Sequence, residues 1–193
     1  MTHHSITQSL NHPLIDSALV FAARAHASQR RKSTDVPYIV HPVGVMLVLL
    51  EMGETDPEML AGALLHDTVE DTGVKLTEVR AQFGERVAEI VEGCSEPDKS
   101  DSWENRKRHT VAYLPTAPRA VQLVSAADKL HNLRSMMRDY AAQGERLWKR
   151  FNRGKADIAW YYRSVAESLR AGEHGAHPLI QQLSATVNDF FPP

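Results

Sequence analysis

The sequence predicts an all-α fold. Apolar residues recur three and four positions apart, the spacing that places them on one face of a helix, as at Val121, Val124 and Ala127. No segment alternates apolar and polar residues in the way that a half-buried strand does. Proline and glycine residues separate the apolar segments, at the places where helices begin and end. These three observations together favour a bundle of helices without a sheet.

The ends of the predicted helices follow from local signals. Pro42 suits the first turn of a helix, and Gly53 suits the position after its end. Asp56 and Pro57 begin the next helix, and Gly84 separates two shorter ones. We expect loops at residues 29–40 and 95–102, and helices at residues 13–28, 42–51, 56–67, 77–83, 85–92, 103–114, 118–138, 147–151, 155–171 and 178–191.

We expect one domain. A chain of 193 residues with 42% hydrophobic content can bury one sizeable core and is short for two. The core is expected over about residues 13–171, with a C-terminal helix at about residues 178–191, in a single domain of residues 1–193.

The amino-acid composition indicates which class of ligand the protein binds and in which cellular compartment it works. The formal charge of -2 and a pI near 6.5 provide no general field for a nucleic-acid polymer, so we expect a small anionic ligand. The single cysteine, Cys94, excludes an intrachain disulfide and suits a reducing compartment, so we expect the cytoplasm. The apolar run at residues 43–50 is too short to span a bilayer, and no export signal or membrane anchor is evident. The oligomeric state is not predicted.

The most informative motif is His66-Asp67, which is followed by Glu70-Asp71. It ends the apolar run at residues 59–65, so four ionisable groups lie where burial is expected. An imidazole and three carboxylates at the end of a buried helix would cost several kcal/mol without a compensating cation. A divalent metal ion is the usual compensation, so the motif predicts a metal site.

Two further residues complete a candidate coordination sphere. His41 precedes a predicted helix and Asp128 lies inside an apolar run, so both are added to His66 and Asp67 as predicted ligands. Mixed nitrogen and oxygen donors suit Mn, Fe or Zn better than Ca, and the choice among these ions stays open. Taken singly, each residue more often has a structural role, as a solvated histidine or a capping aspartate. Their conjunction favours the metal site.

Glu70 and Asp71 are the candidate catalytic residues. They lie four positions after His66 and Asp67, so each shares a helix face with one predicted ligand. A carboxylate at this offset can take the proton of a water whose pKa the metal lowers, and that water can attack a phosphorus atom. The alternative is a solvated helix end with ordinary turn chemistry at residues 71–73.

An ordered set of motifs, RKS (31–33), PYIVHP (37–42), ALLHDTVEDT (63–72), FG (83–84) and ADKLHNLR (127–134), resembles one family closely. From about residue 22 to residue 169, the chain resembles the HD superfamily of metal-dependent phosphohydrolases. Within it, the chain is similar to the hydrolase domain of RelA/SpoT-type alarmone enzymes and to the small alarmone hydrolases. The resemblance implies an HD-domain phosphohydrolase helical bundle.

The resemblance also implies an activity. Members of this family remove pyrophosphate from the 3′ position of guanosine tetra- or pentaphosphate, (p)ppGpp, and leave GDP or GTP, commonly with bound Mn²⁺. By matched position, the four predicted ligands would hold the metal, and Glu70 with Asp71 would position and deprotonate the attacking water. The chain is then expected to be a stand-alone hydrolase of a small phosphorylated purine nucleotide.

Matched positions also imply substrate contacts. Arg31 and Lys32 would clamp the nucleotide, because a guanidinium can stack on a purine or pair with phosphate and lysine supplies a compact charge. The alternative for this pair is an exposed basic loop, and the alternative for Asn132 is a polar neighbour of Asp128. The predicted substrate-binding residues are Arg31, Lys32, Ser33, Asn132, Arg153, Lys155 and Tyr162.

The residues are compatible with other functions as well. The loop at residues 33–37 is slightly longer than in the bifunctional enzymes of the family, which affects the choice between guanine and adenine. A second enzyme hypothesis keeps the metal and changes the substrate to an adenine alarmone, (p)ppApp, a deoxynucleotide or the 2′-phosphate of NADPH. A third hypothesis is a non-catalytic nucleotide sensor with a structural metal.

Overall fold

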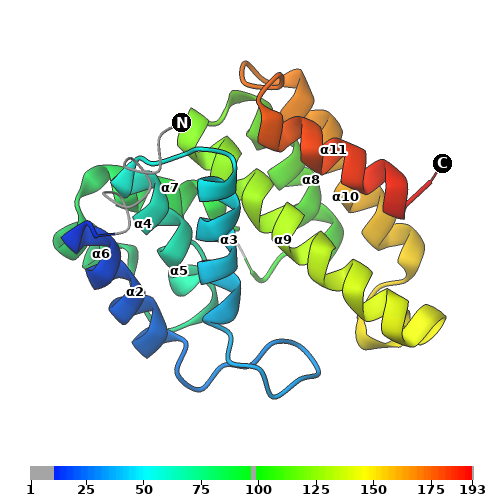
Figure 1. Ribbon diagram of the computed structural model, residues 1–193, viewed down its shortest axis with the longest axis horizontal. Coiled ribbons are helices and arrows are strands. Elements are labelled where there is room, and N and C mark those ends of the chain that lie inside the picture. Colours follow the sequence, from blue (N-terminus) through cyan, green and yellow to red (C-terminus); the bar gives the residue numbers. More distant parts are fainter. Residues whose placement is uncertain (1–10, 97–98, 193) are drawn as a thin grey trace.

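The computed structural model describes residues 11–96 and 99–192, and its regular structure there consists of helices (Figure 1). The predicted all-α class is confirmed. In this part of the chain, β structure is limited to an isolated bridge between Arg30 and Pro37. The elements are α2 (Pro13–Ala25), α3 (Val40–Glu51), α4 (Pro57–Leu65), α5 (Thr68–Asp71), α6 (Leu76–Phe83), α7 (Glu85–Cys94), α8 (Trp103–Tyr113), α9 (Arg119–Gln143), α10 (Lys155–Ala171) and α11 (Pro178–Phe190), with 3₁₀ segments η1 (Leu114–Thr116) and η2 (Gly144–Arg150).

Helix α4 is the central element of the first half. Residues 59–65 are all buried, as expected for a helix that is apolar on every side. The helix packs against α2, α3 and α7. Gly62 permits the close approach to α7, because a Cβ atom there would lie 2.6 Å from Cγ2 of Ile90. The C-terminal end of α4 therefore lies deep in the protein.

Helix α9 links the two halves of the fold. It packs against α3 and α7 on one side and against α10 and α11 on the other. Figure 1 shows α3 and α9 running side by side through the middle of the molecule. The buried residues of α9 include Val124, Ala127 and Leu130, which confirms the apolar face predicted for this segment. Asp128 is buried on the same helix.

Several helices begin with a capping side chain that is followed by proline. A carboxylate oxygen of Asp56 accepts a 3.1 Å hydrogen bond from the amide of Glu58, and Pro57 occupies the first turn of α4. His12 and His177 cap α2 and α11 in the same way, each before a proline. These caps satisfy amides that have no partner within the helix, so the helix starts are fixed locally.

The third predicted helix is wrong at its end. It was expected to continue through residue 67, whereas α4 ends at Leu65 and the short helix α5 begins at Thr68. The hydroxyl of Thr68 donates a 2.7 Å hydrogen bond to the carbonyl of Leu65, and Nδ1 of His66 lies 2.8 Å from the carbonyl of Ala63. Side chains thus bond carbonyls that a continued helix would use, and the break allows His66 and Asp67 to face the interior.

The segment after residue 138 also differs from the prediction. Helix α9 continues to Gln143 and ends at Gly144, whose φ of 59° needs glycine, and the helix expected at residues 147–151 is the 3₁₀ segment η2. The ring of Tyr140 lies 5.6 Å from that of Phe190 in α11, so tertiary packing extends α9. The first helix, α2, ends at Ala25 instead of residue 28. Just after this end, Nδ1 of His26 lies 2.6 Å from the side-chain oxygen of Gln29.

None of the described helices is both long enough and apolar enough to cross a membrane.

Candidate metal centre and substrate cavities

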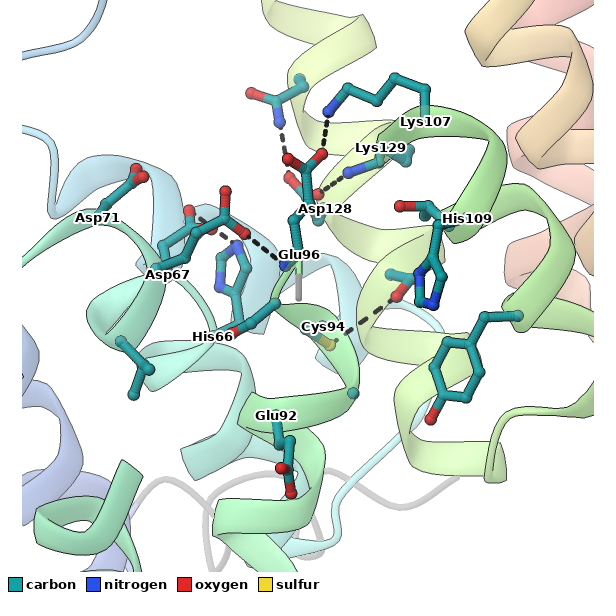
Figure 2. Close-up of a pocket in the computed structure, with 18 of the residues that line it drawn as sticks. His66, Asp67, Asp71, Glu92, Cys94, Glu96, Lys107, His109, Asp128 and Lys129 are labelled. Carbon is teal, nitrogen blue, oxygen red and sulfur yellow. Dashed lines mark hydrogen bonds and ion pairs between the residues drawn. The ribbon is translucent and has the colours of Figure 1, made fainter. Parts of the chain in front are cut away.

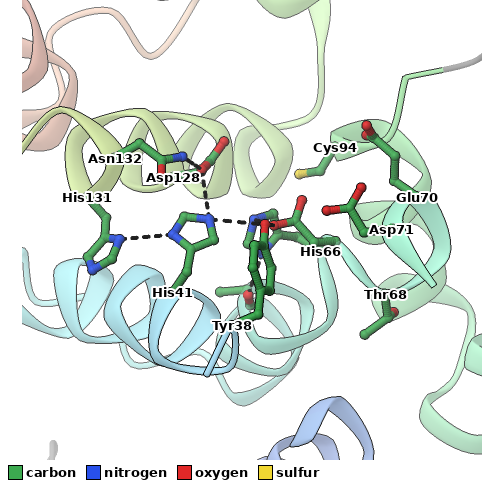
Figure 3. Close-up of polar contacts among 12 residues, drawn as sticks. Tyr38, His41, His66, Thr68, Glu70, Asp71, Cys94, Asp128, His131 and Asn132 are labelled. Atoms are coloured by element: carbon green, nitrogen blue, oxygen red, sulfur yellow. Dashed lines mark hydrogen bonds and ion pairs between the residues drawn. The ribbon is translucent and has the colours of Figure 1, made fainter. Parts of the chain in front are cut away.

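The predicted metal ligands come from separate parts of the chain and meet at one point. His41 lies in the first turn of α3, and Asp128 lies in the middle of α9. His66 and Asp67 form the break between α4 and α5. Ligand atoms of His41, His66 and Asp128 lie within 4.8 Å of one another, and all three residues are buried (Figure 3). The fold therefore assembles the predicted cluster.

Asp67 lies beside these three residues and approaches two of them through Oδ2. That oxygen lies 3.0 Å from Nε2 of His66 and 3.5 Å from Nε2 of His41. Nε2 of His41 also lies 3.1 Å from Oδ1 of Asp128. Nε2 of His66 is buried, and besides the close carboxylate of Asp67 it has no polar partner within the described structure, so once deprotonated it can donate its lone pair to an ion. Two imidazoles and two carboxylates fit a divalent ion that accepts nitrogen and oxygen donors.

The charges of the cluster shift the pKa values of its members. Burial alone would lower the pKa of His66, but the carboxylates of Asp67 and Asp128 outweigh burial and raise that pKa to about 9. For His41 burial dominates and the pKa is lowered. Burial opposes ionisation of the two carboxylates, yet His66 lowers the pKa of Asp67, and Lys129 with His41 lowers that of Asp128. Both carboxylates are therefore ionised at neutral pH and favour a cation between them.

Glu70 and Asp71 lie on α5, one turn beyond the cluster (Figure 3). An oxygen of Glu70 accepts a 3.0 Å hydrogen bond from the amide of Glu96, and burial raises the pKa of the Glu70 carboxyl. Asp71 accepts hydrogen bonds from Lys99 at 3.0 Å and from Gln29 at 3.3 Å. The two carboxylates thus sit in different environments. The raised pKa strengthens the ionised Glu70 carboxylate as a base relative to an unshifted glutamate.

A cavity of about 900 Å³ opens onto the cluster (Figure 2). All four predicted ligands line it, together with Glu70 and Asp71. Two cations, Lys107 and Lys129, line it as well. Lys129 pairs with Asp128 and Lys107 pairs with Glu96, and Nζ of Lys107 lies 4.8 Å from the ring centre of Tyr161. The predicted metal ligands, the two candidate catalytic carboxylates and two lysines therefore line the same cavity.

A second cavity of about 500 Å³ adjoins the first, and Tyr38 and Asn132 line both. Arg31 donates a 2.8 Å hydrogen bond to Oδ1 of Asn132, and its guanidinium lies 5.6 Å from the ring centre of Tyr38. Nζ of Lys32 lies 5.6 Å from the ring centre of Phe151. The charged residues of this wall are Arg31, Lys32, Arg138, Arg150 and Asp139. The lining thus contains four cationic side chains and one carboxylate, so this cavity suits an anionic ligand.

A model of the HD domain matches residues 18–158, which is more than half of the chain. The chain belongs to the HD-domain family. The matched region contains the four predicted ligands and the Glu70-Asp71 pair. The family resemblance drawn from the motifs is therefore confirmed.

Relatives of this HD domain include two curated guanosine-3′,5′-bis(diphosphate) 3′-pyrophosphohydrolases named MESH1. The Homo sapiens protein is 48% identical and the Danio rerio protein 46% identical, each over 120 residues. The aligned segment covers 61% of this chain and 66% of each relative, slightly less than two thirds of their length. A solved structure of a metazoan ortholog of SpoT, which hydrolyses ppGpp and plays a role in starvation responses, superposes with a TM-score of 0.77. That match has 28% identity and covers 93% of this chain and 96% of the other.

Three of the predicted substrate contacts lie outside the cavity walls of the HD domain. Ser33, Arg153 and Lys155 are exposed and are absent from the described linings of both cavities. Ser33 has a φ of 61° in the loop before α3. Arg153 pairs with Glu104, and Lys155 pairs with Glu145. Tyr162, by contrast, is buried and lines the smaller cavity.

Several residues of the site escaped the sequence reasoning. Tyr38 bonds to Asp67, and its place in the PYIVHP motif was the available signal. Lys129 follows Asp128 inside the same apolar run, so its expected burial was also visible. Glu96 belongs to a polar loop in which no periodicity marks it as partly buried. Only its ion pair with Lys107 of α8, at the wall of the cavity, reveals it.

Proposed function

We propose that this HD domain removes the 3′-pyrophosphate from (p)ppGpp and releases pyrophosphate together with GDP or GTP. The observation that carries the proposal is the meeting of the candidate metal cluster with Glu70 and Asp71 at the wall of one cavity. The adjoining cationic cavity offers a place for the rest of a charged nucleotide. The names of the MESH1 relatives support this choice of reaction.

The candidate ligands would hold one divalent ion. We propose Mn²⁺, with Fe²⁺ and Zn²⁺ as alternatives that the same donor set accepts. Such an ion lowers the pKa of water and draws charge from phosphoryl oxygens when it is bound. Lys129 pairs with Asp128 and would keep that carboxylate ionised and in place for the ion.

Glu70 and Asp71 would orient the attacking water and take its proton. The raised pKa of Glu70 makes its carboxylate a stronger base than an exposed glutamate. The water oxygen bonds to the phosphorus next to the ribose, and the bond from that phosphorus to the 3′ oxygen breaks. The carboxylate pair takes one proton from the water and passes it to the 3′ oxygen, which leaves as a hydroxyl, while the other proton of the water stays with the released pyrophosphate. Lys107 and Lys129 border the space in which pyrophosphate charge develops.

The nucleotide would extend from the larger cavity into the smaller one. Asn132 and Tyr38 lie at the junction, where we place the ribose. Arg31 and Lys32 would then meet the base or the 5′-diphosphate, and Tyr162 would close the same wall. The substrate roles predicted for three further residues, Ser33, Arg153 and Lys155, stay predictions. Their side chains lie outside the linings of the two cavities.

A substrate panel tests the proposal. We would measure kcat/KM of the Mn²⁺-loaded protein for guanosine tetraphosphate, its adenine counterpart, a deoxynucleoside triphosphate and NADPH, with Glu70→Gln as the inactive control. We expect guanosine tetraphosphate to give the highest value and pyrophosphate to be the released product. Preference for NADPH or the adenine compound would support the second enzyme hypothesis instead. Binding of nucleotides without turnover would support the sensor hypothesis.

A further inference from the structure

We infer that His131 is the positioning residue for His41, and that residue 44 is glycine because the His131 ring occupies the space beside it. The inference rests on the proposed function in one respect: it takes His41 to be a metal ligand. It assigns a role to two residues outside the coordination sphere, one on α9 and one on α3.

The two ring nitrogens of His41 face different partners. Nε2 faces the carboxylates of Asp128 and Asp67 at 3.1 Å and 3.5 Å, whereas Nδ1 lies 2.9 Å from Nδ1 of His131. Figure 3 shows His131 and Asp128 at opposite nitrogens of the His41 ring. A neutral imidazole has one protonated nitrogen and one lone pair. If Nε2 binds the ion, Nδ1 must carry the hydrogen and donate it, so His131 must accept through Nδ1.

His66 shows the arrangement that His41 lacks. Nδ1 of His66 faces the carbonyl of Ala63 at 2.8 Å, so the backbone fixes its tautomer. The corresponding carbonyl for His41 belongs to Tyr38, and the amide of His41 itself occupies it at 2.8 Å. His41 therefore takes its acceptor from another helix. This makes its orientation dependent on a side chain that substitution can remove.

Gly44 lies one turn after His41 on α3, where α9 packs closely. A Cβ atom at this position would lie 2.1 Å from Nε2 and 2.4 Å from Cδ2 of His131. Both distances are too short for real atoms, so the imidazole would have to move. Since the ring is held at 2.9 Å from His41, moving it would break or misalign that hydrogen bond. Gly44 thus leaves the space that the His131 ring needs to hold its hydrogen bond with His41.

His131 also lines the smaller cavity, so a substrate contact is the competing role. The two roles can be distinguished by measuring metal binding in the absence of nucleotide. A positioning residue changes the affinity of the free protein for the metal, whereas a substrate contact leaves that affinity unchanged. Mn²⁺ alone, titrated into metal-stripped protein and followed by the electron paramagnetic resonance of the unbound ion, is therefore the probe.

Two substitutions of His131 carry the test. His131→Leu removes the acceptor and keeps an apolar side chain, and we expect Mn²⁺ affinity to fall by about 10- to 100-fold, the usual effect of losing such a partner. His131→Asn places an amide oxygen near the position of Nδ1, and we expect it to restore most of the affinity. Equal affinity of the Leu variant and the unsubstituted protein would overturn the inference. So would equal loss in both variants, because the ring itself would then matter instead of the acceptor.

Gly44→Ala supplies an independent arm, with Gly154→Ala as the matched control because a Cβ atom there meets no neighbour within 4 Å. We expect Gly44→Ala to weaken Mn²⁺ binding and Gly154→Ala to leave it unchanged. In a His131→Ala background the ring is gone, so adding Gly44→Ala should have little further effect. Fully additive losses would contradict the proposed link. Far-UV circular dichroism of the metal-free variants shows that each one is folded.

The outcomes also separate this inference from the proposed function. If the unsubstituted protein binds no Mn²⁺, Fe²⁺ or Zn²⁺, the metal centre itself is wrong and the inference falls with it. If that protein binds an ion and every His131 and Gly44 variant binds it equally well, only the inference fails.

Discussion

The hydroxyl of Tyr38 donates a 2.6 Å hydrogen bond to Oδ2 of Asp67. This is the same oxygen that lies 3.0 Å from Nε2 of His66. Burial, followed by the charge of Asp67, raises the pKa of Tyr38 well above its usual range, so the phenol keeps its proton and remains a donor. Tyr38 therefore holds one carboxylate of the candidate metal centre in a fixed orientation.

Replacing Tyr38 with Phe should reduce Mn²⁺ affinity by roughly 10-fold, at the lower end of the range for partners of metal ligands. The ring remains, so its contact with the His41 ring, 5.6 Å between ring centres, is kept and stability should change little. A Mn²⁺ titration checks this, with Tyr140→Phe as the control because its hydroxyl bonds Glu145 away from the site. Unchanged affinity would mean that Tyr38 does not orient Asp67.

Replacing Glu70 with Gln should lower kcat by about 10²- to 10⁴-fold while the protein keeps its metal. The pKa of Glu70 is raised by burial, and the base must be ionised to accept a proton. Activity should therefore rise with pH through a pKa above the usual 4.5 of glutamate, and Glu70→Gln should remove that rising limb. A pH profile of kcat/KM together with metal analysis checks both parts. A large loss of bound metal would instead make Glu70 a ligand.

Replacing Arg31 with Ala should raise KM for the nucleotide by about 10- to 100-fold, the value of a lost hydrogen bond to a charged group. Its guanidinium bonds Asn132 and faces the smaller cavity. Arg30→Ala is the matched control, because that side chain bonds the carbonyls of Ala27 and Gln29 instead. Equal KM values for the two variants, measured at saturating Mn²⁺, would remove Arg31 from the substrate site.

A charge cluster far from the metal predicts pH-dependent stability. Glu54 pairs with Arg119 at 2.6 Å and with His177 at 3.0 Å, and it ties the loop before α4 to α9 and α11. Burial alone would raise the pKa of Glu54, but its hydrogen bonds with Arg119 and His177 outweigh burial and lower it. Its ionised form therefore stabilises the fold above the usual pKa of 4.5, and that contribution disappears as the pH falls through the lowered value.

Glu54→Gln should lower the free energy of unfolding at pH 7 by about 1–2 kcal/mol and leave hydrolysis unchanged. Denaturant unfolding at pH 7 and at pH values below 4 checks this. The difference between the two proteins should shrink as the pH falls, because Glu54 is then protonated in both states. A difference that grows at acid pH would contradict the sign of the shift.

The metal cluster was predictable because the free-energy cost of burying its charged residues can be read from their neighbours in the sequence. His66 and Asp67 end an apolar run, and Asp128 interrupts another, so the sequence itself places charge where burial is expected. Lys129 follows from the same argument. The end of α9 could not be predicted, since it depends on contacts between Tyr140 and an aromatic residue some fifty positions later. No packing argument from the sequence bears on Arg153 and Lys155, and the structure pairs their side chains with Glu104 and Glu145 outside the two cavity linings.

The most direct measurement uses metal-stripped protein and its Asp128→Asn variant, each incubated with guanosine tetraphosphate with and without Mn²⁺, with products identified by phosphorus NMR. We expect pyrophosphate and GDP only from the unsubstituted protein with Mn²⁺, because the neutral amide of the variant lacks the charge that holds the ion. Hydrolysis at equal rates without metal, or equal turnover by the variant, would contradict the proposed centre. Release of inorganic phosphate in place of pyrophosphate would contradict the proposed reaction.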